Sequence, residues 1–251
     1  MAPSSAAPEN RPPFEDVLAH LPISNTTEYR KGQIIYGPDQ PSTDIYLVAS
    51  GKVKLSRISE EGGEVLLEIM RTDELFGQSG FLTVPNRSEQ ATALENSKVM
   101  TWPISAMEDL VAKRPRLAVA LLQIFAQRNA EFALRIASFS LDNIQRRLAR
   151  SLIHLCERLG TPEENGSFRM MPFTHELLAQ HIGTSREIVT LYMNQFRKDG
   201  YLRYSRQEIT VYRDVLAAAI VGTTHSRTVI DRADAQDTVE VKAAATATEP
   251  S

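Results

Sequence analysis

Cysteine is nearly absent from this sequence: Cys156 is the only one among 251 residues. A single cysteine excludes a disulfide within the chain, a four-cysteine iron–sulfur site and a zinc site built from two cysteines and two histidines. The residue lies in the apolar segment SLIHLC, so we expect a packed core thiol. The five histidines are scattered, and none pairs with a carboxylate at metal-ligand spacing. We therefore expect no metal centre.

Long apolar runs and an excess of positive charge are also missing. No apolar run reaches the roughly 20 residues that span a bilayer. The N-terminal MAPSSAAPENRPP has neither the basic nor the apolar part of a signal peptide. We expect a cytoplasmic protein with no membrane partner. The formal net charge is -3, so binding of nucleic acid would require a local basic face.

Both ends of the chain are poor in residues that could form a core, and we expect residues 1–13 and 222–251 to be disordered. Residues 14–115 contain short apolar strands separated by turns such as Gly-Pro-Asp, Ser-Gly-Lys and Gly62-Gly63. This spacing predicts a small antiparallel β-roll. Beyond it the pattern becomes helical, so the expected fold class is α+β.

Three helices are expected after the strands. The segment SAMEDLVAKR predicts a short helix that Ser105 caps and Pro115 stops. A longer helix is expected from about Arg116 to Ser138, within a segment of residues 116–140. LDNIQRRLARSLIHLCERLG predicts a third helix with Gly160 at its C′ position. Its buried positions include three leucines: Leu148, Leu152 and Leu155.

The longer helix carries an apolar stripe with two possible partners. The stripe could pack on the roll of the same chain, or on the same helix of a second copy. The residues assigned to one face are Leu117, Leu121, Ile124 and Phe125, and Phe132 and Ile136 roughly continue it.

The segment FTHELLAQHIGTSREIVTLYMNQFRKDGYL has the pattern of a helix-turn-helix. The spacing Ala179-x₃-Gly183-x₅-Val189 places a small residue where two helices cross, a glycine in the turn and an apolar residue in the second helix. Thr174 is expected to cap a first helix that runs through Gln180. The following residues predict a capping box, formed by Thr184 and Glu187 at the start of the second helix.

Helical geometry then divides the second helix into two faces. Ile188, Val189 and Tyr192 are expected to be buried. The residues left for the major groove are Ser185, Arg186, Glu187, Thr190 and Leu191. Arg186 suits guanine O6 and N7, and Glu187 suits the amino group of cytosine.

A basic region surrounds this motif. Residues 168–213 hold seven basic and four acidic residues, a net charge of +3. The segment GYLRYSRQEITVY predicts a hairpin directly after the second helix, which is the wing of a winged helix over residues 141–221. Phosphate contacts are expected from Thr174, Ser185, Arg197, Lys198, Arg203, Ser205 and Arg206.

Taken together, these segments resemble the Crp/Fnr superfamily over about residues 14–221. The resemblance rests on KGQIIY, PDQPSTDIYLVASGKVKL, FGQSGFL with NRS, the long helix, and GTSREIV. It implies a homodimer through the long helix, a near-palindromic DNA site and RNA polymerase as a further partner. Ser185, Arg186 and Glu187 match a Ser-Arg-Glu triplet that contacts DNA in the cyclic-AMP receptor branch. That branch reads bases with an Arg four residues later, where this chain has Leu191, so we expect a related target with an apolar contact there or none.

The resemblance also places an effector site in the roll. Gly77, Arg87 and Ser88 match a phosphate-binding cassette, in which a helix N-terminus and a guanidinium hold an anion. Ser79 lies in the same segment. Gln78 stands where the family has a ribose-binding Glu, and the stretch RNAEFALRI lacks the Thr-Ser that the long helix offers to adenine.

Three alternatives therefore stay open for the effector: cyclic AMP, another small anionic ligand, or none. Arg87 could also serve only as the partner of Glu89 or Glu95. Haem is disfavoured because no histidine falls convincingly in the roll.

Two other classes of protein are weaker fits. A ligand-binding regulatory subunit that gates a partner protein could carry the same roll, but it has no reason to carry a winged helix. An enzyme is disfavoured because no nucleophile–base pair, metal cluster or Walker motif is recognisable.

Overall fold

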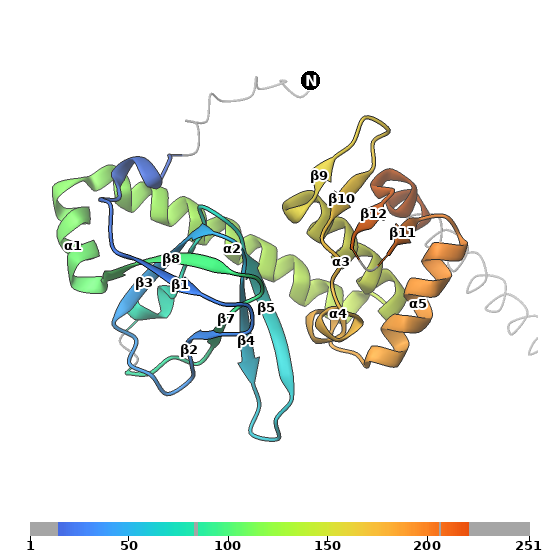
Figure 1. The fold of residues 1–251 in the computed structure, drawn as a ribbon, viewed down its shortest axis with the longest axis horizontal. Helices are drawn as coiled ribbons and strands as arrows, with labels where there is room; N and C mark the ends of the chain where they lie inside the picture. Colours follow the sequence, from blue (N-terminus) through green and yellow to red (C-terminus); the bar gives the residue numbers. More distant parts are fainter. Residues whose placement is uncertain (1–14, 83–84, 206, 221–251) are drawn as a thin grey trace, which may run out of the picture. The chain divides into compact units, whose positions relative to one another are not determined.

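The computed structural model describes residues 15–82, 85–205 and 207–220 and divides into two compact units between Ser140 and Leu141 (Figure 1). The ends expected to be disordered, residues 1–13 and 222–251, lie outside the described residues. The fold is α+β, as predicted from the sequence. Among the described helices, none has the length and hydropathy of a membrane-spanning segment.

The first unit contains the predicted antiparallel β-roll. Two four-stranded sheets have the orders β1-β8-β3-β6 and β2-β7-β4-β5. Gly62, in the left-handed conformation at φ 82°, allows the predicted turn between β4 and β5. The strands are β1 (Thr26–Tyr29), β2 (Ile34–Tyr36), β3 (Asp44–Ser50), β4 (Val53–Ile58), β5 (Glu64–Met70), β6 (Leu75–Phe76), β7 (Gln90–Ala93) and β8 (Ser97–Pro103).

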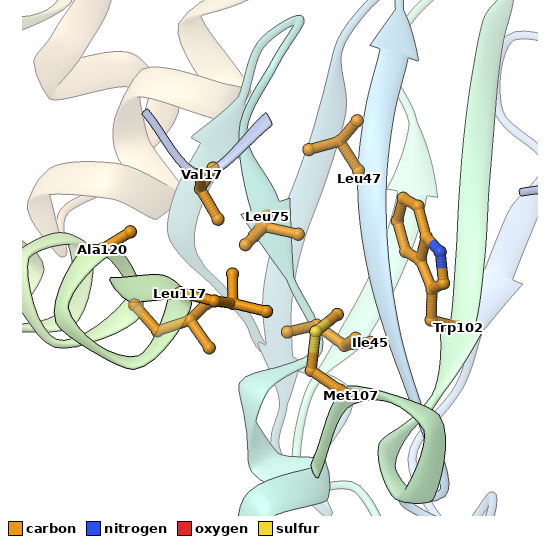
Figure 2. Close-up of a cluster of buried hydrophobic side chains, with 9 residues drawn as sticks. Val17, Ile45, Leu47, Leu75, Trp102, Met107, Leu117 and Ala120 are labelled. Atoms are coloured by element: carbon orange, nitrogen blue, oxygen red, sulfur yellow. The ribbon is translucent and has the colours of Figure 1, made fainter. Parts of the chain in front are cut away.

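Alternation along β3 supplies two cores, because successive side chains of a strand point to opposite faces. Val48 packs between the two sheets with Tyr36 and Phe76. Ile45 and Leu47 point the other way, into a cluster that two helices and the N-terminal segment complete. Figure 2 shows this second cluster, whose members are Val17, Ile45, Leu47, Leu75, Trp102, Met107, Leu117, Ala120 and Leu121.

The helices that cover the roll differ from expectation at one cap. Helix α1 spans Ile104–Lys113 and α2 spans Pro115–Leu141. Ser105 lies inside α1, and the N-cap residue is Pro103, which makes no side-chain cap. The expectation that Ser105 caps this helix is therefore wrong. Pro115 begins α2, where the missing N–H of proline has no cost.

The apolar stripe expected on one face of α2 is divided between two environments. Leu117 and Leu121 are buried against the roll, and Ile124 and Phe125 pack partly on the same cluster. Ile136, in contrast, is 67 % exposed, and Phe132 also lies at the surface. In the second half of α2, the side that faces the roll carries arginines instead of apolar residues. Arg128 donates to the main-chain oxygen of Leu75, and Arg135 donates to those of Leu66 and Leu67. The expectation of a single apolar face is therefore wrong.

The second unit is a winged helix-turn-helix. Its sheet has the order β11-β12-β10-β9. Leu148, Leu152 and Leu155 of its first helix are buried as predicted. The elements are α3 (Ile144–Leu159), β9 (Thr161–Pro162), β10 (Phe168–Met170), α4 (His175–Ile182), α5 (Arg186–Lys198), β11 (Leu202–Tyr204) and β12 (Ile209–Val211).

Two further expectations concern the end of α3. Cys156 is a buried thiol, as expected, and burial raises its pKa to about 11. Gly160 follows the helix but is extended, at φ -91° and ψ 159°, rather than left-handed. Its role is close packing, because an added Cβ would lie 2.5 Å from the main-chain oxygen of Cys156. Gly160 therefore closes α3 without the left-handed cap that a C′ glycine usually supplies.

A leucine pair on α2 tests the packing of the roll. Leu117→Ala removes a fully buried side chain from the cluster of Trp102, and we expect a loss of about 2–5 kcal/mol in the free energy of unfolding. Leu134→Ala, at a position 74 % exposed on the same helix, should change it by less than about 0.5 kcal/mol. Urea unfolding followed by fluorescence of Trp102, the only tryptophan, measures both; equal losses would contradict the packing.

Candidate DNA-binding surface and effector site

The turn of the helix-turn-helix forms as the sequence predicts, with one shift. Thr174 caps α4 by accepting from the N–H of Leu177, and Gly183 ends it in the left-handed conformation at φ 66°. The N-cap of α5 is Ser185, which accepts from the N–H of Ile188 at 3.4 Å. The capping box predicted from Thr184 is therefore wrong by one residue, because Thr184 still belongs to the turn, where its N–H donates to Ala179.

The small core under the motif also differs in part from the expected one. Leu178, Ala179 and Ile182 of α4 are buried, and Val189 of α5 is fully buried. Ile188 and Tyr192, which were expected to be buried, are only half-buried. The inward face of α5 instead continues from Val189 through Met193 and Phe196, at intervals of four and three residues.

The first turn of α5 presents charged side chains to solvent. Arg186 and Glu187 are exposed, and among the described residues Arg186 forms no ion pair. Hydrogen bonding from its own main-chain N–H, and then from Ser185, lowers the pKa of Glu187, so it is a carboxylate acceptor. Leu191, one turn further, is 63 % exposed. These side chains are free to contact a ligand outside the domain.

Thr190 is half-buried and its hydroxyl bonds within the domain, unlike the side chains of its predicted groove-facing neighbours. Its hydroxyl donates to the main-chain oxygen of Arg186 at 2.8 Å and lies 2.8 Å from Nδ1 of His175. Since the single hydroxyl proton goes to the carbonyl, Nδ1 of His175 carries the proton of the second contact. Burial, and then the charge of Arg186, lower the pKa of His175. A neutral imidazole thus joins the start of α4 to α5.

The wing is joined to α5 by a second set of contacts. The hydroxyl of Tyr204, on β11, donates to Oδ1 of Asn194 at 3.0 Å, and the guanidinium of Arg197 lies 5.3 Å from the centre of its ring. The ring of Tyr204 also meets that of His175 edge-on, 6.0 Å between centroids. One aromatic side chain therefore fixes the hairpin against both helices.

The predicted phosphate-binding residues lie in different environments. Thr174, Ser185, Lys198 and Arg203 are exposed, and Lys198 and Arg203 have no ion pair within the described part of the chain. Arg206 lies outside the described residues. In contrast, two other basic residues of the region have carboxylate partners: Arg169 pairs with Glu163 and Glu208, and Arg213 with Glu157 and Asp214.

In the roll, the residues predicted to bind an effector come together around Arg87. This side chain is buried and donates to the main-chain oxygens of Asp44 (2.6 Å) and Gly77 (3.3 Å) and to Oγ of Ser79 (3.2 Å). Gly77 precedes the 3₁₀ turn Gln78–Phe81 at φ 81°, and an added Cβ there would lie 3.1 Å from Nη1 of Arg87. Only glycine allows this approach of backbone and guanidinium.

The alternative partners of Arg87 are also distinguished by the structure. Glu89 lies 4.0 Å from Nη1 of Arg87, whereas Glu95 pairs with Lys52 at 2.9 Å. Ser88 is exposed, and its hydroxyl donates to Glu89. The side-chain oxygen of Gln78 is buried and accepts no hydrogen bond among the described residues.

Comparisons with known proteins agree with this geometry. Residues 26–114 match the family "Cyclic nucleotide-binding domain", and residues 146–219 match the "Crp-like helix-turn-helix domain". The chain belongs to the Crp/Fnr superfamily of transcriptional regulators. It is a helix-turn-helix transcriptional regulator and not an enzyme.

Similar proteins of this superfamily come from several bacteria. The global nitrogen regulator of Synechococcus elongatus is 28% identical over 75% of this chain and 86% of its own. The CRP-like cAMP-activated global transcriptional regulator of Mycobacterium tuberculosis is 28% identical over 73% and 82%. A CRP/FNR-family regulator from Thermus thermophilus has a structure with TM-score 0.63, 26% identity and coverage of 77% and 97%. FixK2 from Bradyrhizobium japonicum has the same fold, with TM-score 0.69, 20% identity and coverage of 78% and 96%.

Sequence reasoning missed several residues that shape the two sites of this Crp/Fnr regulator. His175, Asn194 and Tyr204 were not singled out, although they connect α4, α5 and the wing. Tyr36, whose ring lies 4.1 Å from the guanidinium of Arg87, was missed as well. No local spacing marks these residues, because each contact joins residues that belong to different segments of the fold.

The neutral state of His175 gives a prediction about pH. Its titration midpoint should lie below the ordinary value of about 6.5. As the pH falls, His175 therefore takes up its proton in the unfolded chain before it does so in the folded protein. The neutral side chain favours the folded state above about pH 6.5, and this contribution is lost as the pH falls from there through the midpoint of the folded protein. An NMR titration of the imidazole measures the midpoint.

Two variants test whether the charge of Arg186 contributes to the low midpoint of His175. Arg186→Ala should raise the midpoint of His175, because it removes a nearby positive charge. Arg213→Ala, whose charge is paired with Glu157 and Asp214, should leave the midpoint unchanged. A midpoint at or above about 6.5 in the unaltered protein would show that His175 is not buried beside the charge of Arg186 as described.

Proposed function

We propose that this Crp/Fnr regulator acts as a homodimer on a near-palindromic site in double-stranded DNA. The observation that carries the proposal is the exposed Ser185–Arg186–Glu187 turn at the start of α5. In a helix-turn-helix this end of the second helix enters the major groove. The exposure of Arg186 without an internal ion pair supports its use on DNA. We expect the regulator to act in the cytoplasm, with RNA polymerase as a further partner.

Base reading is assigned to three exposed side chains. Arg186 is suited to a bidentate contact with guanine, and Glu187 accepts from the amino group of cytosine. Leu191 lacks polar atoms and suits a thymine methyl group. A good bidentate contact would contribute about 1–3 kcal/mol of discrimination. Thr190 is omitted from this set because its hydroxyl already bonds within the protein.

Phosphate contacts are assigned to groups at the starts of α4 and α5, at the C-terminal end of α5 and in the wing. Thr174 and Ser185 lie at the starts of the two helices, where N–H groups and the helix dipole favour an anion. Lys198 and Arg203 carry charges that have no carboxylate partner among the described residues. Arg197, Ser205 and Arg206 are the other members of the set expected from the sequence. Such contacts raise affinity for any sequence and make it depend on salt.

Two substitutions distinguish base contacts from phosphate contacts. Arg186→Ala should relax the preference at one base pair of each half-site, whereas Lys198→Ala should weaken binding to all sequences alike and lower the salt slope by about one. Selection from random DNA at one fixed salt concentration, with and without cyclic AMP, measures the preference. No enrichment of a two-fold symmetric site in either condition would contradict the proposed function. An unchanged preference after Arg186→Ala would remove Arg186 from the reading set.

The outward face of α2 supports the homodimer. Its exposed residues follow one another at intervals of three and four, the spacing of a two-helix coiled coil. They lie on the side of α2 opposite Leu117, Leu121 and Arg128, which face the roll. Their order is Val119, Leu122, Ala126, Asn129, Ala133 and Ile136. A central Asn in such a seam would set the register of the two helices.

A charge introduced into this face tests the pairing. Leu122→Asp should convert the dimer to a monomer and reduce affinity for a full symmetric site, because a carboxylate would be buried between two helices. Leu134→Asp, on the same helix but outside the spacing, should remain dimeric. Sedimentation equilibrium measures the mass. A monomeric unaltered protein, or equal dissociation of the two variants, would contradict this interface.

The contacts of the roll favour DNA binding without cyclic AMP. A relative from Mycobacterium tuberculosis is cAMP-activated by its name. In this chain, however, Gln78 brings no charge to the ribose position. In addition, Arg87 already has partners inside the protein. Of the three alternatives for the effector, these features support a roll that does not require a diffusible anion.

A further inference from the structure

Three hydroxyl groups around Arg87 donate to one carboxylate of the protein itself. Oε1 of Glu89 accepts from Oγ of Ser79 at 3.1 Å and from the hydroxyl of Tyr36 at 3.3 Å. Oε2 accepts from Oγ of Ser88 at 3.3 Å. The side chain of Glu89 is only 14 % exposed. Ser79 and Ser88 are residues expected to hold an effector anion, so Glu89 occupies the position of their acceptor.

The guanidinium of Arg87 is connected to the same carboxylate. Its side chain is 1 % exposed, Nη1 lies 4.0 Å from Oε1 of Glu89, and it also donates to Ser79, which in turn donates to Glu89. A charge buried to this extent requires a compensating charge or hydrogen bonds. Glu89 supplies the negative charge nearest to Arg87 among the described residues.

The surrounding side chains hold this arrangement in place. Arg87 lies over the ring of Tyr36, which is 1 % exposed and packs with Tyr46 and Phe76. Burial raises the pKa of Tyr36, so its hydroxyl keeps the proton that it donates to Glu89. The donors are therefore fixed before any ligand arrives.

We propose that Glu89 is a built-in anion that takes the position of an effector phosphate or carboxylate in the roll. This inference rests on the proposed role of the roll as effector domain. A second anion at the same donors would meet the charge of Glu89 at close range, and two like charges there repel each other. The unaltered roll thus stays in an anion-filled state and has no free site for a small anion. Removal of the carboxylate opens that site to formate, acetate or inorganic phosphate.

Chemical rescue of a Glu89 variant tests the proposal. Glu89→Ala leaves Arg87 without its counter-charge, and we expect its thermal midpoint to fall by about 5 °C. Formate, acetate or inorganic phosphate should restore most of this loss relative to chloride at equal ionic strength. Fluorescence of Trp102 reports the unfolding of the roll alone, since it is the only tryptophan and lies in the core of the roll. DNA binding is not part of the readout, so failure of the proposed function would not alter the result.

Two matched variants distinguish a vacated site from a general effect of salt. Glu95→Ala removes a carboxylate from a surface pair with Lys52 in the same unit, and its midpoint should not respond to the choice of anion. Glu89→Gln removes the charge but keeps the volume, so its midpoint should fall without rescue. If Glu89→Ala is too unstable to purify, a rise in the midpoint of Glu89→Gln with acetate would overturn the proposal.

Three further results would also overturn the proposal about Glu89. Stabilisation of the unaltered protein by cyclic AMP or inorganic phosphate, to the degree seen with Glu89→Ala, would show that the site is open and the inference wrong. A Glu89→Ala variant that melts like the unaltered protein, or a Glu95→Ala variant rescued equally well, would overturn it too.

Discussion

The contacts that fix which face of α2 points toward the roll are the constraint on which both the roll and its proposed partner surface depend. Leu117 and Leu121 bury apolar surface against the sheet, and Arg128 and Arg135 donate to main-chain carbonyls further along the helix. Two of those carbonyls belong to β5, the edge strand of its sheet, where backbone groups lack a strand partner on one side. Because apolar and charge-assisted contacts fix the same face, the opposite face is exposed along the helix. Under the proposed function, this face pairs with the same helix of a second copy of the chain.

The parts of this fold that could be predicted are those whose cause is local. Gly183 is needed for a left-handed turn, Ala179 for a close helix crossing and Val189 for the core beneath, so the motif follows from spacing alone. The cap of α5 was displaced by one because Thr184 and Ser185 are both good N-cap residues, and sequence does not show which one leaves the turn. The roll was likewise predictable from its turns, since glycines such as Gly51 and Gly62 separate short apolar strands.

Contacts between distant segments could not be predicted. Arg128 and Arg135 resemble surface residues in a helical pattern, yet both bond to carbonyls of the roll and one is buried. The stripe on α2 was therefore assigned to one face when the helix has two. At the effector site, spacing identified Gly77 and Arg87 but could not show where the carboxylate of Glu89 points. An arginine that binds a ligand and one that binds its own chain have the same sequence signature, and only the arrangement of acceptors separates them.

The polar residues of α5 divide between holding the domain together and facing outward. Thr190 and Asn194 bond to His175 and Tyr204, so they fix α4 and the wing to the recognition helix. The residues left to face DNA lie mainly at its two ends. With a rise of about 1.5 Å per residue, Lys198 lies about 18 Å along the axis from Arg186. Base reading and phosphate contact are thus separated along one rigid helix. Under the proposed function, sequence preference would depend on a few side chains of the first turns, whereas affinity would be spread over charges that salt screens.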